Sequence, residues 1–198
     1  MSDTTTRPDE LLRELEDRLH PRLNRDRVLD QLDEMFLAGR APDPQPRGFL
    51  RGRLVTTATV AGVDAVARLI AGAWMPWLGK SFDPEAQTGV NVLLANARLA
   101  LRTVWPGYVP EREGGGRIEA FPFRTRIAPG TLDPQVEVLK IDYDWDPNPD
   151  RVVRHILDEL VQVSDDTYLG KILYRGRGHE EAGGAPTWRA IGFFSLHA

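Results

Sequence analysis

The chain has 198 residues, 41% hydrophobic and 27% charged, which is typical of a globular protein with one well-buried core. A net charge of −4 argues against a nucleic-acid binder, and the absence of cysteine excludes disulfides and thiolate chemistry. No apolar run reaches the roughly 20 residues that span a bilayer, and the N-terminus lacks the apolar core of a signal peptide. We therefore expect a cytoplasmic protein without a membrane span. Only three of the 25 basic residues are lysines, a bias that indicates a GC-rich bacterial genome.

The first 40 residues have the spacing of two helices. The expected helices cover residues 8–20 and 24–38, and each has an apolar stripe: Leu11, Leu12, Leu15 and Leu19 in the first, and Val28, Leu29, Leu32 and Phe36 in the second. Asn24 is a suitable N-cap, and prolines at 42, 44 and 46 predict an extended linker. We therefore divide the chain into a helical segment at 1–40, a linker at 41–47 and a domain at 48–198.

From residue 48 the hydrophobic period changes to two, which indicates strands. Expected strands cover 48–60, 77–83, 117–127, 135–145, 160–163, 168–175 and 188–196, and expected helices cover 63–75 and 148–160. The composition of residues 90–104 would also suit a helix, but their polar residues fall on one alternating face, so we favour a strand. Without regular βαβ alternation, this order predicts an α+β fold that is mainly an antiparallel, closed barrel of about eight strands.

A short motif occurs twice, as WLGKSF at 77–82 and YLGKIL at 168–173. It is not a phosphate-binding P-loop, because Trp74 stands where that motif needs glycine and Pro84 prevents the helix that must follow. We expect Gly79 and Gly170 to mark bends or close backbone approaches. Lys80 and Lys171 each share a face with apolar residues. They lie either on the outer surface or inside, paired with an anion, and we favour the surface because buried lysine is rare unless paired.

Three segments together resemble a family of small bacterial and fungal proteins. They are WLGKSFD, the stretch IDYDWDPNPDRVVRHILDELVQVSDDTYLGKILYR, and the closing GFFSL. The family pattern has W-x-GK-x-F, then DY…IRDE, YLG and F-x-L, and the likeness covers roughly residues 48–198. The resemblance implies a lipocalin-like barrel. It transfers no catalytic residue to this chain, since the matching positions look structural.

Two polar clusters have ordinary structural interpretations. Asp residues alternate in DYDWDPNPD at 142–150, as in a calcium loop, but Pro147 replaces the required glycine and Val153 the final glutamate. On the expected helix at 148–160, His155 would share a face with Asp158 and Glu159, which suits a histidine base but is more typical of a solvated face. We expect no metal and no cofactor.

Aromatic residues on the expected strands indicate an interior pocket for a small molecule. We predict stacking by Trp77, Tyr143, Tyr168 and Trp188 beside Phe194, with Lys80, Lys171 or Asn91 orienting a polar end. The first hypothesis is therefore a barrel that binds an apolar or amphipathic molecule of lipid, terpenoid or polyketide type. The second is a cofactor-free cyclase, isomerase or dehydratase that uses a lysine, Asp142 or a tyrosine as acid or base. The third is an interaction module whose N-terminal helices bind a partner or a second copy.

Overall fold

The computed structural model describes residues 7–17, 25–57, 76–150, 152–176 and 187–198. The predicted helix at 63–75 and the predicted cap Asn24 lie outside these residues. Among the described helices, none has the length and apolar character needed to cross a membrane.

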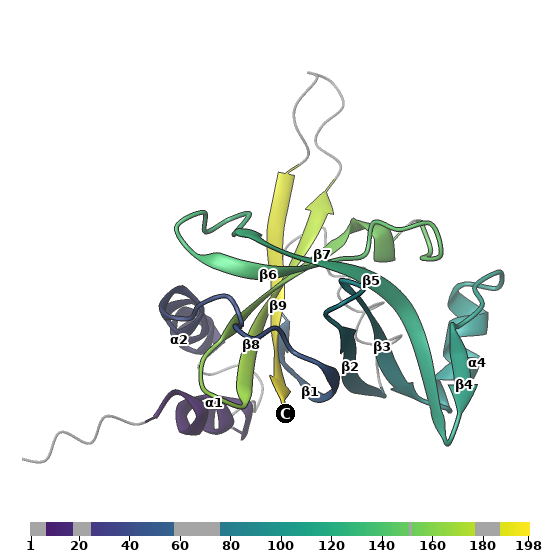
Figure 1. The fold of residues 1–198 in the computed structure, drawn as a ribbon, viewed down its shortest axis with the longest axis horizontal. Helices are drawn as coiled ribbons and strands as arrows, with labels where there is room; N and C mark the ends of the chain where they lie inside the picture. The colour runs from purple at the N-terminus through teal and green to yellow at the C-terminus, as the bar shows by residue number, and fades with distance from the viewer. Residues whose placement is uncertain (1–6, 18–24, 58–75, 151, 177–186) are drawn as a thin grey trace, which may run out of the picture.

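The strands form a single antiparallel sheet in the order β3-β2-β1-β9-β8-β7-β6-β5-β4. Additional pairing of β3 with β5 closes eight of the strands into a barrel, and β4 lies outside it beside β5 (Figure 1). The predicted antiparallel barrel is confirmed. The strands are β1 (Gly48–Thr57), β2 (Trp77–Asp83), β3 (Thr88–Leu94), β4 (Arg112–Gly114), β5 (Arg117–Pro129), β6 (Glu137–Asp142), β7 (Ile156–Gln162), β8 (Thr167–Gly176) and β9 (Thr187–His197).

The two N-terminal helices pack against the outside of the barrel. They are α1 (Pro8–Asp17) and α2 (Arg25–Ala38), and Figure 1 shows them together on one side of the sheet, beside β8. Their apolar residues meet the outward side chains of the strands in one buried cluster: Leu12, Val28, Leu32, Phe36, Val55, Val136, Val138, Val161, Leu169 and Phe193. Leu12, Val28, Leu32 and Phe36, which belong to the described part of the apolar stripe, are therefore covered by the barrel.

One element prediction is wrong in part and another is wrong. The strand predicted at 90–104 is right for residues 90–94, which belong to β3, but residues 97–104 form a helix, α4 (Ala97–Val104), in which Ala97 and Leu101 are buried one turn apart. The predicted helix at 148–160 is a single 3₁₀ turn, η1 (Val153–His155), followed by strand β7. Residues 156–161 are all buried, because the barrel interior covers one face of β7 and the outer cluster the other. Such a strand lacks the period of two.

Glycines allow aromatic rings to lie directly on the strand backbone. A Cβ atom at Gly170 would lie 2.1 Å from the ring of Phe194, and one at Gly52 would lie 2.3 Å from the ring of Trp77. Gly79 has a φ of +146°, and a Cβ there would lie 2.0 Å from the carbonyl oxygen of Leu50. The predicted close approach of another backbone is confirmed at Gly79, whereas at Gly170 the close neighbour is the Phe194 side chain.

Candidate functional site

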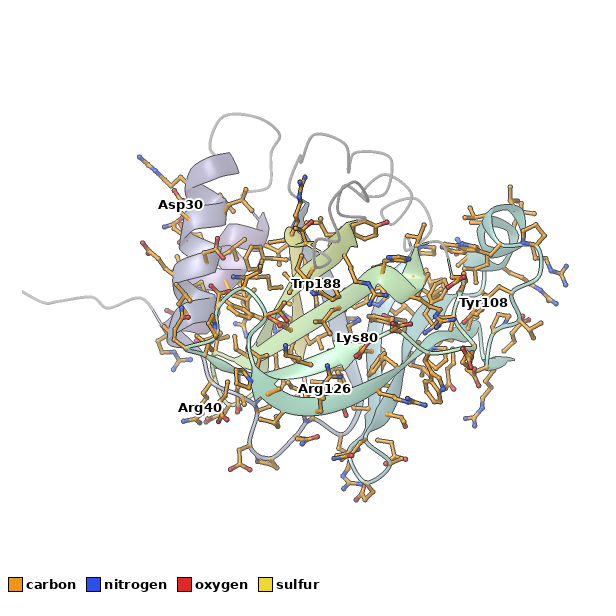
Figure 2. All side chains as sticks on the ribbon, turned by 90° about the horizontal axis from the view of Figure 1, so that it is seen from above. Asp30, Arg40, Lys80, Tyr108, Arg126 and Trp188 are labelled. Carbon is orange, nitrogen blue, oxygen red and sulfur yellow. The ribbon has the colours of Figure 1, made fainter. Side chains whose placement is uncertain are left out.

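The two Leu-Gly-Lys motifs place their lysines on opposite sides of the barrel wall. Lys80 pairs across the sheet with Leu50 and Asn91, which belong to the interior, and its side chain is 0% exposed. Figure 2 shows Lys80 among the strands of the barrel. Lys171 pairs instead with Glu159 and Phe193 on the outer face. The preference for an outer surface is thus wrong for Lys80. For Lys171 the face is right, although α2 covers it.

An irregularity in β2 brings Trp77 to the interior together with Lys80. The register with β3 shifts between Trp77 and Gly79, so that Trp77 is opposite Leu93 and Lys80 is opposite Asn91. Leu78 is the extra residue of this bulge, which moves Trp77 onto the face that simple alternation assigns to Leu78. The left-handed conformation that the bend requires at Gly79 is accessible to glycine at little cost.

Lys80 is the centre of a cluster of four polar side chains, here called the interior cluster: Lys80, Asn91, Tyr143 and Asp158. The Lys80 Nζ atom lies 2.9 Å from Asp158 Oδ2 and donates to Asn91 Oδ1 at 3.1 Å and to the Tyr143 hydroxyl. All four side chains are fully buried. They come from β2, β3, the end of β6 and β7, so the closed barrel is what brings them together.

Further hydrogen bonds fix the orientation of the cluster. The Tyr143 hydroxyl donates to Asp158 Oδ2 at 3.1 Å and accepts from Asn91 Nδ2 at 3.1 Å. Asn91 Nδ2 also donates to the Phe121 carbonyl at 3.2 Å, and Trp77 Nε1 donates to Asn91 Oδ1 at 3.1 Å. Asp158 Oδ1, by contrast, is buried and accepts no hydrogen bond from any residue that the structure describes. A buried acceptor of this kind is expensive unless it is satisfied, so it is the natural position for a ligand donor.

Aromatic rings surround the charged end of Lys80. Nζ lies 5.0 Å from the ring centroid of Phe194, 5.1 Å from that of Tyr143, 5.4 Å from that of Phe123 and 5.6 Å from that of Trp77. Their faces attract a cation, but they replace water that would solvate it. The amine therefore depends on the polar atoms of the interior cluster.

Burial shifts the protonation of the cluster toward neutral forms. It lowers the pKa of Lys80 and raises the pKa of Asp158, and the attraction between the two side chains opposes both shifts without cancelling them. Burial also raises the pKa of Tyr143 well above its ordinary value, so that the phenol stays protonated. The two shifts reduce the free-energy difference between the ion pair and the neutral amine–carboxylic acid pair.

Of the eight predicted ligand-binding residues, Trp77, Lys80, Asn91, Tyr143 and Phe194 come together in the structure. Tyr168 is also in the interior, where it pairs across the sheet with Leu196. Trp188 is separate from the cluster: it belongs to neither core cluster of the described residues, and the Arg175 guanidinium lies 5.8 Å from its ring.

Lys171 is outside the barrel and cannot orient an interior ligand. Its Nζ forms ion pairs of 2.7 Å with Asp33 of α2 and with Asp133, and it lies 4.4 Å from the ring centroid of Phe36. The ion pair with Asp33 connects α2 to strand β8 of the barrel. Asp142, the predicted acid or base, directly precedes Tyr143, but its side chain pairs with Arg126 at 2.9 Å.

The face predicted to join His155, Asp158 and Glu159 does not form, because Asp158 and Glu159 are neighbours on a strand and point to opposite sides. Asp158 enters the interior cluster, and Glu159 pairs on the outer face with Lys140 at 3.3 Å. The aspartates proposed as a calcium alternative instead bind arginine: Asp144 and Asp146 lie 2.9 Å and 3.3 Å from Arg154. The described residues contain no group of three or more potential metal ligands.

Fold and site together define a closed antiparallel barrel, of lipocalin-like form, with an ionisable cluster in its interior. No protein-family model and no curated protein matches the chain. A crystal structure of a protein from Thermomonospora curvata is similar to it, with 21% sequence identity and a TM-score of 0.46 over 93% of this chain and 97% of the other. A likeness at this level carries no functional information.

Proposed function

We propose that the protein binds a small apolar or amphipathic molecule inside the barrel, with the polar group of that molecule held by the interior cluster. The observation that carries this proposal is the pair Lys80–Asp158, fully buried inside a ring of aromatic side chains. Buried ion pairs seldom stabilise a fold as well as apolar residues of similar volume. Few polar groups within an apolar surrounding are typical of small-molecule sites.

The chemistry of the cluster selects the ligand's polar group. A ligand hydroxyl can donate to Asp158 Oδ1, which has no donor among the described residues. A ligand carbonyl oxygen can accept from Lys80 Nζ, while the rings of Trp77 and Phe194 contact the apolar part of the ligand. Lipids, terpenoids and polyketides combine a large apolar body with one or two such oxygens.

Trp77 connects the cluster to the surface. It lines a surface cavity of about 900 Å³ together with Gly52 and Leu78, and its indole donates to Asn91 within the cluster. The Trp77 ring also packs edge-on against Phe194, with centroids 5.7 Å apart. A ligand that enters the interior should therefore change the fluorescence of Trp77.

Native mass spectrometry of the purified protein, repeated after denaturation, tests the proposal. We expect an apolar compound that co-purifies one-to-one and is lost on unfolding, or tight binding of a member of a panel of fatty acids, terpenoids and polyketides. Lys80→Met should abolish binding, whereas Lys171→Met, in the identical tripeptide on the outer face, should keep it. Binding unaffected by Lys80→Met, or an apo mass with no tryptophan response to the whole panel, would contradict the proposal.

A second candidate function is proton-transfer catalysis in the same barrel, such as isomerisation, cyclisation or dehydration. It is favoured by the pKa of Lys80 being lowered and that of Asp158 raised at a separation of 2.9 Å, because acid–base groups work best when their pKa values approach the working pH. A bound ketone should then exchange its α-protons with D₂O faster than in buffer, and Asp158→Asn should remove the acceleration. Proton NMR measures this exchange. Equal exchange rates with the wild-type protein and with Asp158→Asn would contradict the catalytic function and leave only the binding function.

The interaction-module hypothesis receives less support. It requires an exposed apolar stripe on the N-terminal helices, and the stripe residues Leu12, Leu32 and Phe36 are buried against the barrel.

A further inference from the structure

The three lysines of the chain are all largely buried, but only one is held in a setting that suits a nucleophilic amine. Lys171 forms ion pairs with two carboxylates, and Lys140 pairs with Glu159 and donates to Thr131. Lys80 forms an ion pair with Asp158 and also donates to an amide oxygen and to a phenol, and four aromatic rings surround its amine. Amines in apolar, desolvated pockets are the ones that attack carbonyl carbons.

We propose that Lys80 is a nucleophile that forms an imine with the carbonyl group of an aldehyde or ketone bound in the barrel. This inference rests on the proposed binding function, and it narrows the ligand to molecules that carry a reactive carbonyl. Two observations support it: Nζ is fixed at one end by Asp158, and the Tyr143 hydroxyl beside it can donate to the carbonyl oxygen once Asp158 is protonated and no longer requires that proton.

The steps balance with the groups present. Lys80 first transfers a proton to Asp158, and the neutral amine attacks the carbonyl carbon; a C–N bond forms, and the C=O π electrons move to oxygen. Asp158 protonates this oxygen, recovers a proton from nitrogen, and then protonates the hydroxyl group, which leaves as water when the C–O bond breaks. The products are a protonated imine on Lys80, the Asp158 carboxylate and one water. No oxidant or reductant is needed.

The final state resembles the resting state of the site. A protonated imine is a cation at the Lys80 position, opposite the Asp158 carboxylate, as the ammonium group is at 2.9 Å in the structure. Asn91 Oδ1 accepts from the nitrogen of the cation, as it does from the ammonium group, and the surrounding rings of Phe123 and Phe194 exclude water, which would hydrolyse the imine. Because the pKa of Lys80 is lowered and that of Asp158 is raised, the first proton transfer costs less than it would between the same two groups in water.

The test is reductive trapping on the full-length protein. Pentane-2,4-dione and benzaldehyde, each with sodium cyanoborohydride at neutral pH, are incubated with the protein, and adducts are located by peptide mass mapping. The reactive amines of the chain are Lys80, Lys140, Lys171 and the N-terminal amine, so peptide mapping can assign each adduct to one amine. Because Nζ is reached only through local opening of the barrel, a long time course is recorded. We expect Lys80 to be modified faster than Lys171, since its lowered pKa leaves a larger fraction of the amine neutral.

Variants separate reactivity from folding. Lys80→Arg retains a cation beside Asp158 but cannot form an imine, so it should lose the adduct at that position and keep the adduct levels at Lys140 and Lys171. Asp158→Asn keeps Lys80 and should slow its modification about 100-fold, the usual contribution of a positioned acid–base group. If Asp158→Asn unfolds the protein, which circular dichroism would show, the pH dependence of Lys80 modification in the wild type provides the same information. An ordinary lysine-like pH profile would overturn the proposal.

Binding of benzyl alcohol, which lacks the carbonyl, distinguishes this inference from the proposed function. If benzyl alcohol perturbs Trp77 fluorescence but benzaldehyde gives no adduct at Lys80, the imine inference is wrong and the binding function stands. If neither compound affects Trp77 or Lys80, both proposals fail for this class of probe. Selective trapping at Lys80 that benzyl alcohol inhibits would support both.

Discussion

Replacing the lysine in each Leu-Gly-Lys motif by methionine should have very different effects on stability. Methionine is similar in length to lysine and removes the charge, so the comparison isolates the electrostatic environment of two identical tripeptides. In Lys80→Met, Asp158 remains 0% exposed and loses its cation, with only the Tyr143 hydroxyl still bonded to Oδ2. Removing one partner of a buried ion pair lowers the free energy of unfolding by about 3–5 kcal/mol. At about 2–4 °C per kcal/mol for a chain of this size, the melting temperature should fall by roughly 6–20 °C.

Lys171→Met should be much milder. Its partners Asp33 and Asp133 have side chains that are 51% and 19% exposed, so water reaches both carboxylates once the cation is gone. The methionine side chain still packs on Phe36 and Phe193, which lie beside the lysine in the structure. We expect a loss of about 1 kcal/mol, the scale of a solvated ion pair.

Urea unfolding of the two single variants, and of Asp158→Leu and Lys80→Met/Asp158→Leu, completes the measurement. Because apolar replacement of a whole buried pair is often close to neutral, the double variant should be more stable than either single variant. The coupling free energy between Lys80 and Asp158 should be about 3 kcal/mol. Additive effects, or a Lys80→Met loss no larger than that of Lys171→Met, would refute the assignment of Lys80 to the interior pair.

Three further predictions concern packing and pH. Gly170→Ala puts a Cβ atom 2.1 Å from the Phe194 ring and should cost about 1–3 kcal/mol by thermal melting, whereas Gly107→Ala, with no atom within 4 Å, should cost little; equal losses would contradict the packing described. Phe36→Ala should remove about 3–5 kcal/mol and expose α2 to limited proteolysis, and unchanged protease resistance would count against the docking of α2 on the barrel. Burial raises the pKa of Tyr108 to about 12 from its ordinary 10.0, so its contribution to stability is complete below pH 10 and is lost as pH rises toward 12. Tyr108→Phe should therefore reduce the alkaline loss of stability in urea titrations, and an identical pH slope would disprove this origin.

The barrel was predictable because most of its strands alternate in the sequence, and the polar–aromatic interior was partly predictable for the same reason. Trp77, Lys80, Asn91, Tyr143 and Phe194 were identified from their positions on expected strands. Their convergence was not visible, because it depends on the closure of β3 onto β5 and on the bulge that turns Trp77 inward.

Asp158 was missed as a member of the site because its strand has a misleading pattern. The apolar residues around it recur at helical spacing as well as strand spacing, and Asn148–Pro149 is a good helix start. Burial of both faces of β7 removes the alternation that would have identified a strand. Residues 156–162 form a strand because they pair with β6 and β8, despite their local preference for a helix. The carboxylate of Asp158, which was expected on the surface, is therefore the partner of Lys80.

Side-chain NMR of lysine tests the central claim most directly. The chain has three lysines, so a sample labelled with ¹⁵N-lysine gives three Nζ signals, assigned by Lys80→Arg and Lys171→Arg. We expect the Lys80 signal to titrate below the ordinary lysine pKa of 10.5. We also expect a fatty acid, terpenoid or polyketide from the panel to shift the Lys80 signal and to leave the Lys171 signal unchanged. A Lys80 signal that titrates normally and responds to no member of the panel would contradict an interior ligand site at Lys80.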